Sequence, residues 1–585
     1  MSSGFQDAIK QQIEKSALKY AVENRLKYGE AKQGPVMNKV LGEFKEFRHL
    51  AREIAGIVAN VVKHVNSLSD SELKDLAEKL SLTESRESRK EERVLPPLPN
   101  VDKWKNVVTR FAPNPDFPIH LGNARAAILS HEYAKMYKGK FILRFEDTDP
   151  RTKPPLPFSY TIIEDDLKWL GVLWDEKYVQ SMRMEKYYSI AKKLIELGYA
   201  YIDLCKSEVF KEYRNAGKAC PHRDLSPEQH LELFEKIFAG EFGEGEAVIR
   251  IKTDLNHPDP AIRDWVMFRI IDTSKNPHPV TGDKYRLWPT YNFAAAVDDY
   301  LLGVSHILRG KEHALNTAKQ VYIYKYLGWK YPEVVNFGRV GLEGLILSKT
   351  WIKNQLKMNP EKFTGFDDIR FATISSLRRR GVLPETIREI ILGLGLSPVD
   401  AKISWVNLAA INRKNVDPIA KRVFVVCNPI KLHLEGVKTP VEVEIPYHPS
   451  KDLGKRKIML TKPEVWISIK DVENMKRGVV IRLMELFNIV VKEQTKDYVI
   501  AYYHSNSLEE ARKHNASIIQ WSPCEQSTKV DILRAEGMRL KRERCVGEQA
   551  LKTLKEGEII QMVRLGFGKI EKIQENKITI IYTHE

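Results

Sequence analysis

The residues with the clearest chemical potential lie in two short segments, 110–123 and 145–149. Three prolines between 113 and 118 exclude both helix and sheet ladder, so an open loop is expected after a strand at 106–112. A helix is expected to begin at Leu121, which places His120 at a strand-to-helix junction. Unpaired backbone N–H groups and the helix dipole favour an anion there. We therefore expect His120 to face a phosphate.

A second strand, expected at 140–146, completes a strand–helix–strand unit, with Gly139 ending the helix. Open α/β sheets bind ligands beyond the carboxyl ends of their strands, which is where these polar segments would lie. Gly122 would let a nucleotide approach the backbone closely because it has no Cβ. A four-residue HxGx pattern recurs by chance, however, and taken alone it is better interpreted as a tight turn with a solvated histidine.

Later segments add the missing specificity. Tyr291 and Arg309 follow apolar stretches that would deliver them to a small polar ligand, although each alone could be a core aromatic or a structural ion pair. Lys349, after Ser348 in a glycine-flanked loop, could stabilise phosphates as negative charge develops in a transition state. The sequence contains neither GxxxxGK[ST] nor GxGxxG, which disfavours P-loop enzymes and ordinary dehydrogenases.

Composition indicates a large basic protein. The 585 residues carry a formal net charge of +16 and a sequence pI of about 9.2. A polyanion partner fits this balance, and so does a solvated positive surface, because charge alone does not separate them. A chain of this length should form several domains, each with its own core.

The cysteines and the N-terminus bear on location. The five cysteines are scattered, odd in number and form no CxxC pair, which predicts a reducing compartment. There is no apolar signal-peptide region and no stretch apolar enough to cross a bilayer, so a soluble cytoplasmic protein is expected. Cys205, Cys220 and His222 could bind zinc. Because they show no clear fourth ligand, we favour structural or solvent-facing roles and predict no metal site.

The periodicity of apolar residues divides the chain into four parts. Helical patterns at 7–28 and 40–62, and a capped helix after Ser69, predict a small N-terminal bundle that ends near residue 95, after a charged linker at 83–93. The predicted fold is a multidomain combination of α/β and all-β parts. Its boundaries are a helical domain at 1–95, a Rossmann-like catalytic domain at 96–354 with an insertion at about 205–282, a helical connector at 355–430 and antiparallel β-barrels at 431–585.

In this order the motifs resemble glutamyl-tRNA synthetases, class I aminoacyl-tRNA synthetases, of the archaeal and eukaryotic branch, from about residue 8 to the C-terminus. Residues 120–123 read His-Leu-Gly-Asn and resemble the HIGH signature; residues 347–350 read Leu-Ser-Lys-Thr and resemble a shortened KMSKS. That branch shares its β-barrel anticodon-binding region with glutaminyl-tRNA synthetases, in agreement with the β-rich C-terminal part. Further blocks similar to this branch lie at 365–370, 377–381 and 403–413.

The resemblance implies a two-step reaction. ATP would activate glutamate to glutamyl-adenylate in the presence of bound tRNA, and the terminal adenosine 2′-hydroxyl of tRNA(Glu) would then attack. Mg²⁺ would arrive with ATP, held mainly by its phosphates, and no protein metal cage is implied. His120, Asn123 and Lys349 would be the catalytic residues. The ATP-binding residues would be His120, Gly122, Asn123, Ser348 and Lys349. We expect a monomer.

Charge argues for glutamate over glutamine. The amino-acid site implied by the resemblance consists of Arg110, Ala112, Asn114, Glu146, Tyr291 and Arg309. A carboxylate side chain matches fixed guanidinium donors, whereas an amide would leave the charge unpaired in a dry pocket. Glutamine-specific relatives typically have Asp-Asp-Thr-Asn where this chain has Glu-Asp-Thr-Asp at 146–149, and they lack an arginine at position 309.

Three positions depart from the general class I pattern. Asn123 replaces the second histidine of HIGH, Ile346 replaces the first lysine of KMSKS, and Ala295 stands where bacterial members have an asparagine. The charge on pyrophosphate would therefore be stabilised by Lys349, with Lys353 as a possible helper.

Other functions stay open at this point. A glutaminyl-tRNA synthetase is the nearest alternative. A metabolite adenylyltransferase could share the HxGx site but would not need the long basic helical and barrel regions. An inactive tRNA-binding paralogue would not need the complete set of pocket residues.

Overall fold

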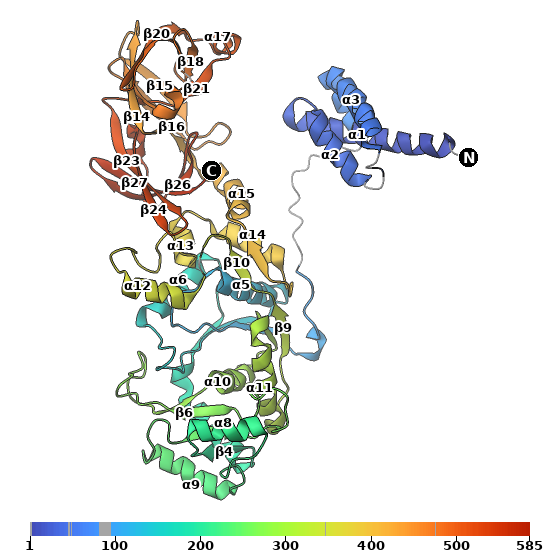
Figure 1. Ribbon diagram of the computed structural model, residues 1–585, viewed down its shortest axis with the longest axis vertical. Helices are drawn as coiled ribbons and strands as arrows, with labels where there is room; N and C mark the ends of the chain where they lie inside the picture. Colours follow the sequence, from blue (N-terminus) through green and yellow to red (C-terminus); the bar gives the residue numbers. More distant parts are fainter. Residues whose placement is uncertain (1–2, 45–46, 48–49, 81–94, 346, 474) are drawn as a thin grey trace. The chain divides into compact units, whose positions relative to one another are not determined.

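The computed structural model describes residues 3–44, 47, 50–80, 95–345, 347–473 and 475–585. The chain forms two compact units, Met1–Val94 and Leu95–Glu585 (Figure 1). Among the described residues, no helix has both the length and the apolar character that a membrane span requires.

The N-terminal unit is helical, with α1 (Ser3–Tyr28), α2 (Gln33–Glu43), α3 (Ala51–Ser67) and α4 (Asp70–Lys79). Ser69 caps α4 as expected, since its hydroxyl oxygen accepts from Glu72 N–H while the Glu72 carboxylate accepts from Ser69 N–H. The single helix expected over 40–62 is wrong: Phe44 leaves the helical region at φ −106° and ψ 57°, and the apolar pattern resumes on α3. The charged linker expected at 83–93 lies outside the described residues.

The second unit begins with a parallel sheet. Strands β1 (Val108–Phe111), β2 (Lys140–Phe145) and β3 (Glu176–Val179) pair in parallel, as do β8 (His306–Gly310) and β9 (Glu333–Phe337). The N–H of Ser305, just before β8, donates to Val108 O on β1, so the two groups are neighbours. The resulting strand order is β3-β2-β1-β8-β9. Strands β2 and β3 lie on one side of β1, and the later strands β8 and β9 lie on its other side. Doubly wound sheets bind ligands at such a switch point in strand order.

Helices connect these strands: α5 (Leu121–Met136), α6 (Pro157–Trp169), α10 (Tyr291–Leu301) and α11 (Ala314–Leu327). Gly139 does not end α5 by adopting a left-handed conformation. Lys138 takes that role with φ 50°. A Cβ on Gly139 would lie 1.9 Å from Val107 O, so the glycine is required by the close approach of two backbone segments.

An antiparallel sheet with the order β4-β5-β6-β7 is inserted between β3 and β8. This sheet extends beyond the insertion expected at about 205–282, since β4 precedes residue 205 and β7 follows residue 282. The elements are α7 (Met184–Glu196), β4 (Ala200–Asp203), α8 (Ser207–Ala216), α9 (Pro227–Phe238), β5 (Val248–Ile251), β6 (Val266–Ile270) and β7 (Leu287–Pro289).

After β9 the chain becomes mainly helical. Strands β10 (Val340–Leu342) and β11 (Ala401–Ile403) pair in parallel. Most of the helical part lies between these two strands in the sequence. The helices are α12 (Lys349–Met358), α13 (Ile374–Arg379), α14 (Pro384–Leu394) and α15 (Trp405–Val416).

The C-terminal part contains two seven-stranded sheets that curl into barrels (Figure 1). The antiparallel barrels expected here are confirmed in the main, although some neighbours, such as β14 and β20, pair in parallel. The strands are β12 (Lys421–Val423), β13 (Val425–Cys427), β14 (Pro429–Glu435), β15 (Val441–Pro446), β16 (Lys455–Leu460), β17 (Glu464–Ser468), β18 (Val480–Leu483), β19 (Asn488–Gln494), β20 (Tyr498–Ser505), β21 (Ser517–Ile519), β22 (Ser522–Pro523), β23 (Ser527–Glu536), β24 (Arg539–Glu548), β25 (Ile559–Met562), β26 (Gly566–Gln574) and β27 (Lys577–His584).

The scattered cysteines, from which a reducing compartment is expected, include one bonded pair. Cys427 and Cys545 face each other across β13 and β24 and form a disulfide. They are separated by 118 residues, so their spacing carried no sign of the contact. Cys205, Cys220 and Cys524 are free.

Candidate active site

A cavity of about 860 Å³ opens where the first parallel strands end. Nearly every residue assigned to substrates from the sequence lines it, and the exception, Ser348, lies next to the lining residue Lys349. The predicted residues on its wall are Arg110, Ala112, Asn114, His120, Gly122, Asn123, Glu146, Tyr291, Arg309 and Lys349.

A buried ion cluster forms one side of the cavity. The carboxylate of Asp299, on α10, accepts hydrogen bonds from Arg110 Nε at 3.2 Å and from Arg144 Nη1 at 2.7 Å. Arg144 Nη2 donates to Glu146 Oε1 at 2.8 Å. All four side chains are at least nine-tenths buried. The cluster therefore joins the ends of β1 and β2 to α10 and sets the direction of Glu146.

The electrostatics of the cluster follow from burial and pairing. Burial would raise the pKa of Asp299, but the two arginines outweigh it and lower the pKa. Burial raises the pKa of Glu146, although Arg144 and Arg110 oppose the shift. Arg110 gives Nε and Nη2 to Asp299, which leaves Nη1 for a ligand.

Arg309, at the end of β8, differs from the other two arginines. It is buried, yet no carboxylate pairs with it among the residues that the structure describes. Its Nη2 donates to the neutral oxygens of Thr317, at 2.7 Å, and Gln320, at 3.3 Å. Its Nε and Nη1 have no hydrogen-bond partner in the described part of the chain. A buried guanidinium without a counter-ion is costly, so the environment of Arg309 is suited to an anionic ligand.

Two neutral polar groups complete this side. Burial and the nearby Glu146 carboxylate raise the pKa of Tyr291 to about 12, so its hydroxyl stays protonated and can donate. Asn114 Oδ1 is buried without a partner in the described part of the chain and can accept. Ala112 adds only a small apolar surface to the wall.

The opposite side begins at the N-terminus of α5. His120 caps this helix: its Nδ1 accepts from Asn123 N–H at 3.4 Å, while Asn123 Oδ1 accepts from His120 N–H at 3.2 Å. Burial, together with Lys349, lowers the pKa of His120 to about 3, so the imidazole is neutral. Because Nδ1 accepts, Nε2 carries the proton and can donate to a phosphate oxygen.

Gly122 has a second reason to be glycine. A Cβ at this position would lie 2.9 Å from His120 Cε1, so a side chain would displace the imidazole. Asn123, which the sequence places among the catalytic residues, uses its carbonyl oxygen to hold the backbone of His120. Gly122 and Asn123 thus also orient the histidine.

Two lysines from α12 meet one carboxylate. Lys349 Nζ lies 3.4 Å from Asp116 Oδ1, and Lys353 Nζ lies 3.1 Å from Asp116 Oδ2. Burial lowers the pKa of Lys349, and Asp116 opposes this shift. Ser348 caps α12 by accepting from Trp351 N–H. The helper role considered for Lys353 is thus geometrically available.

The structure describes only one of the two other positions that depart from the class I pattern. Ala295 is buried within α10 and does not line the cavity. Ile346 lies outside the described residues.

Sequence reasoning missed Arg144, Asp299 and Asp116. Arg144 stands two residues before Glu146 on a strand, so the period of two could have placed both on one face. Asp299 is one of two adjacent acids in an otherwise apolar helical run, which is itself a sign of buried pairing. Nothing local marks Asp116, because its partners lie more than two hundred residues later.

Comparison with known protein families agrees with this geometry. The family described as tRNA synthetases class I (E and Q), catalytic domain, matches residues 106–418, and the corresponding anti-codon binding domain matches 420–505. The chain belongs to this synthetase family. The glutamate–tRNA ligase of Hyperthermus butylicus is 51% identical, covering 95% of this chain and 99% of the relative. That of Pyrococcus furiosus is 47% identical, covering 98% and 100%.

A solved glutamate tRNA ligase from Elizabethkingia meningosepticum is also similar to this synthetase. It is 23% identical with a TM-score of 0.39, and the match covers 53% of this chain and 70% of that one.

We predict that Asp299→Asn in this synthetase weakens glutamate use. The change keeps the shape but leaves two buried guanidinium groups without their shared charge, and breaking a buried ion pair costs about 3–5 kcal/mol. The KM for glutamate should rise more than the KM for ATP in tRNA-dependent ATP–pyrophosphate exchange.

The neighbouring carboxylate offers a matched control. Asp298 is equally buried but accepts from Arg183 and Tyr187, outside the cavity wall. Asp298→Asn should lower the thermal unfolding midpoint without a selective rise in the KM for glutamate. Equal KM changes in the two variants would contradict a positioning role for Asp299.

Proposed function

We propose that the chain ligates L-glutamate to tRNA(Glu) in two steps, ATP-dependent formation of glutamyl-adenylate and transfer to the 2′-hydroxyl of the terminal adenosine. Family membership and the glutamate–tRNA ligase relatives support the reaction. The observation that carries the choice of amino acid is Arg309, a buried guanidinium that lacks a carboxylate partner among the described residues.

Glutamate fits the charge of the cavity. Its side-chain carboxylate would bind Arg309 and its α-amino group would bind Glu146, while Tyr291 donates to the ligand. The buried ion cluster and Arg309 together hold three arginines and two carboxylates, and a glutamate with net charge −1 would neutralise their excess. Glutamine would leave Arg309 buried and unpaired, which argues against the glutaminyl alternative.

ATP would lie along the opposite wall. The Nε2–H group of His120 would donate to its phosphates, and Lys349, helped by Lys353, would stabilise pyrophosphate as it leaves. Positioning and charge stabilisation suffice for adenylate formation, because the glutamate α-carboxylate is itself the nucleophile. Mg²⁺ accompanying ATP would supply further neutralisation of the phosphates.

The remaining parts are assigned to tRNA. In this proposal the insertion at 205–282 contacts the acceptor end, the connector at 355–430 contacts the stem, and the barrels at 431–585 read the anticodon. Unpaired bases are read by stacking and edge hydrogen bonds, and basic residues contact phosphates. The anti-codon binding family match at 420–505 supports the last assignment. It also disfavours a small-metabolite adenylyltransferase. A monomeric state and a cytoplasmic location remain our predictions.

An aminoacylation assay that crosses glutamate and glutamine with tRNA(Glu) and tRNA(Gln) tests this function. We expect charging of tRNA(Glu) with glutamate and no charging with glutamine. Charging with glutamine alone would establish the glutaminyl alternative, and no charging of either tRNA would indicate the inactive paralogue.

Arg309→Cys should lower kcat/KM for glutamate by at least about 100-fold, since the substrate carboxylate loses a charge-assisted hydrogen bond and its buried positive partner. ATP binding should change little. The matched variant Arg309→Lys keeps the charge and should lose less. Unchanged glutamate kinetics in the cysteine variant would contradict the assignment.

Lys349→Ala should retain tRNA binding and lose most tRNA-dependent ATP–pyrophosphate exchange, because the group that stabilises pyrophosphate is removed. Lys357→Ala, on an exposed part of the same helix, is the control and should exchange normally. If exchange survives in Lys349→Ala, the catalytic lysine has been misassigned, and Lys353 is then the candidate.

A further inference from the structure

His278 lies between two segments that carry residues of the amino-acid site. It belongs to the segment between β6 and β7, inside the insertion, and only 1% of its surface is exposed. One of the two neighbouring segments contains Glu146, and the other contains Tyr291. We propose that His278 is a positioning residue that holds Glu146 and Tyr291 at the separation that glutamate requires. This role rests on the proposed function.

A hydrogen bond joins His278 to the first segment. His278 Nε2 lies 2.9 Å from the carbonyl oxygen of Asp147, the residue after Glu146, and 3.5 Å from Asp147 Oδ2. His278 Nδ1 accepts from the N–H groups of Val280 and Thr281, so Nε2 carries the proton and donates. Burial lowers the pKa of His278, although Asp147 opposes this shift, so the imidazole is neutral. At neutral pH the ring therefore accepts on one side and donates on the other.

The other polar groups of the first segment are also engaged. The side chain of Asp147 is fully buried and accepts from Ser181 N–H, the Ser181 hydroxyl and the Tyr160 hydroxyl, each at 2.8 Å. The N–H of Glu146 donates to Pro113 O at 3.0 Å. The imidazole adds a partner for the Asp147 carbonyl, so the backbone is held on both sides of the Glu146 side chain.

Ring stacking joins His278 to the second segment. The imidazole stacks on the indole of Trp288, with 5.1 Å between the ring centroids and 28° between the ring planes. Trp288 is fully buried on β7 and stands three residues before Tyr291, the first residue of α10. The side chain of one residue therefore bridges the segment of Glu146 and the segment of Tyr291.

A second contact keeps the same two segments together. Arg269, on β6, is paired with Trp288 on β7, and its Nη2 lies 2.6 Å from Asp149 Oδ2. Arg269 and Asp149 both line the cavity. Because Asp149 follows Glu146 by three residues, the insertion holds this segment at two points.

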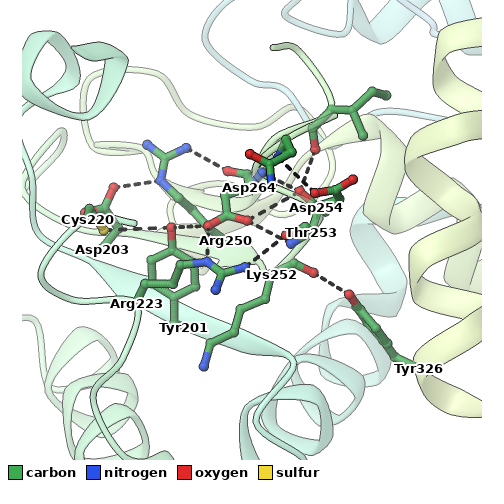
Figure 2. Close-up of polar contacts among 12 residues, drawn as sticks. Tyr201, Asp203, Cys220, Arg223, Arg250, Lys252, Thr253, Asp254, Asp264 and Tyr326 are labelled. Atoms are coloured by element: carbon green, nitrogen blue, oxygen red, sulfur yellow. Dashed lines mark hydrogen bonds and ion pairs between the residues drawn. The ribbon is translucent and has the colours of Figure 1, made fainter. Parts of the chain in front are cut away.

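The sheet that carries His278 is itself fixed. Figure 2 shows the carboxylate of Asp264, just before β6, accepting from the Tyr201 hydroxyl at 2.9 Å and from Arg223 Nε at 2.7 Å. It also shows Tyr326 of α11, whose hydroxyl donates to Lys252 O at 2.6 Å. The segment between β6 and β7 therefore extends from a sheet that is tied internally and attached to a helix of the catalytic domain.

Variants of the full chain test this role in tRNA-dependent ATP–pyrophosphate exchange. His278→Phe keeps a ring over Trp288 but removes the donor, so the KM for glutamate should rise about tenfold or more because a buried carbonyl loses its partner. His278→Asn has an amide too short to reach Asp147 and should show the same rise. His278→Gln can place its amide N–H where Nε2 stands, so its KM for glutamate should stay within about threefold of the wild-type value. The kcat at saturating glutamate and the KM for ATP should change little in each variant.

His230 supplies a control within the same insertion. It is equally buried, but its Nδ1 accepts from Ile202 N–H on β4, outside the cavity wall. His230→Phe should lower the thermal unfolding midpoint without a selective rise in the KM for glutamate. If His278→Phe fails to fold, the glutamine and asparagine variants still decide, because they differ by one methylene and both keep an amide.

Two results would overturn the positioning role and leave the proposed function intact. One is an unchanged KM for glutamate in His278→Asn, and the other is an equal rise in His278→Asn and His278→Gln, each with a wild-type chain that exchanges in the presence of glutamate. Absence of glutamate-dependent exchange in the wild-type chain would instead overturn the proposed function, and the role of His278 with it.

Discussion

The side of the cavity that we assign to the amino acid depends on the buried ion pairs of the Asp299 carboxylate. It compensates Arg110 and Arg144 at the ends of neighbouring strands, and Arg144 in turn holds Glu146. Two guanidinium groups could not be buried here without that shared charge. Their compensation makes Arg309 distinctive, because it is buried at the end of the next strand without a carboxylate partner among the described residues. The unmatched charge is thus located where a side-chain carboxylate can use it.

The two walls of the cavity are built differently. The amino-acid wall is formed by strand ends and a helix N-terminus, whose positions are fixed by the sheet and by buried ion pairs. The phosphate wall combines the N-terminus of α5 with lysines from α12 that share Asp116. In the proposed reaction these lysines would exchange the carboxylate of Asp116 for phosphate oxygens. The proposal therefore assigns selection of the amino acid to the first wall and stabilisation of the phosphate charge to the second.

Local patterns predicted much of this arrangement. The proline-rich loop, the junction at His120 and the β-rich C-terminal part all follow from residue types and spacing, and the structure confirms them. Contacts between distant segments were not predictable in this way. The disulfide of Cys427 and Cys545 depends on strand pairing across 118 residues. The break between α2 and α3 was missed because apolar residues recur at helical spacing in both helices.

We propose that the unpaired charge of Arg309 selects glutamate. Calorimetric titration with the non-hydrolysable sulfamoyl analogues of glutamyl-adenylate and glutaminyl-adenylate measures this directly, because the two ligands differ only in the side-chain terminus. We expect the glutamyl analogue to bind at least about 100-fold more tightly to the wild-type chain, and Arg309→Cys to remove most of this difference. Equal affinities for the two analogues in the wild-type chain would contradict it.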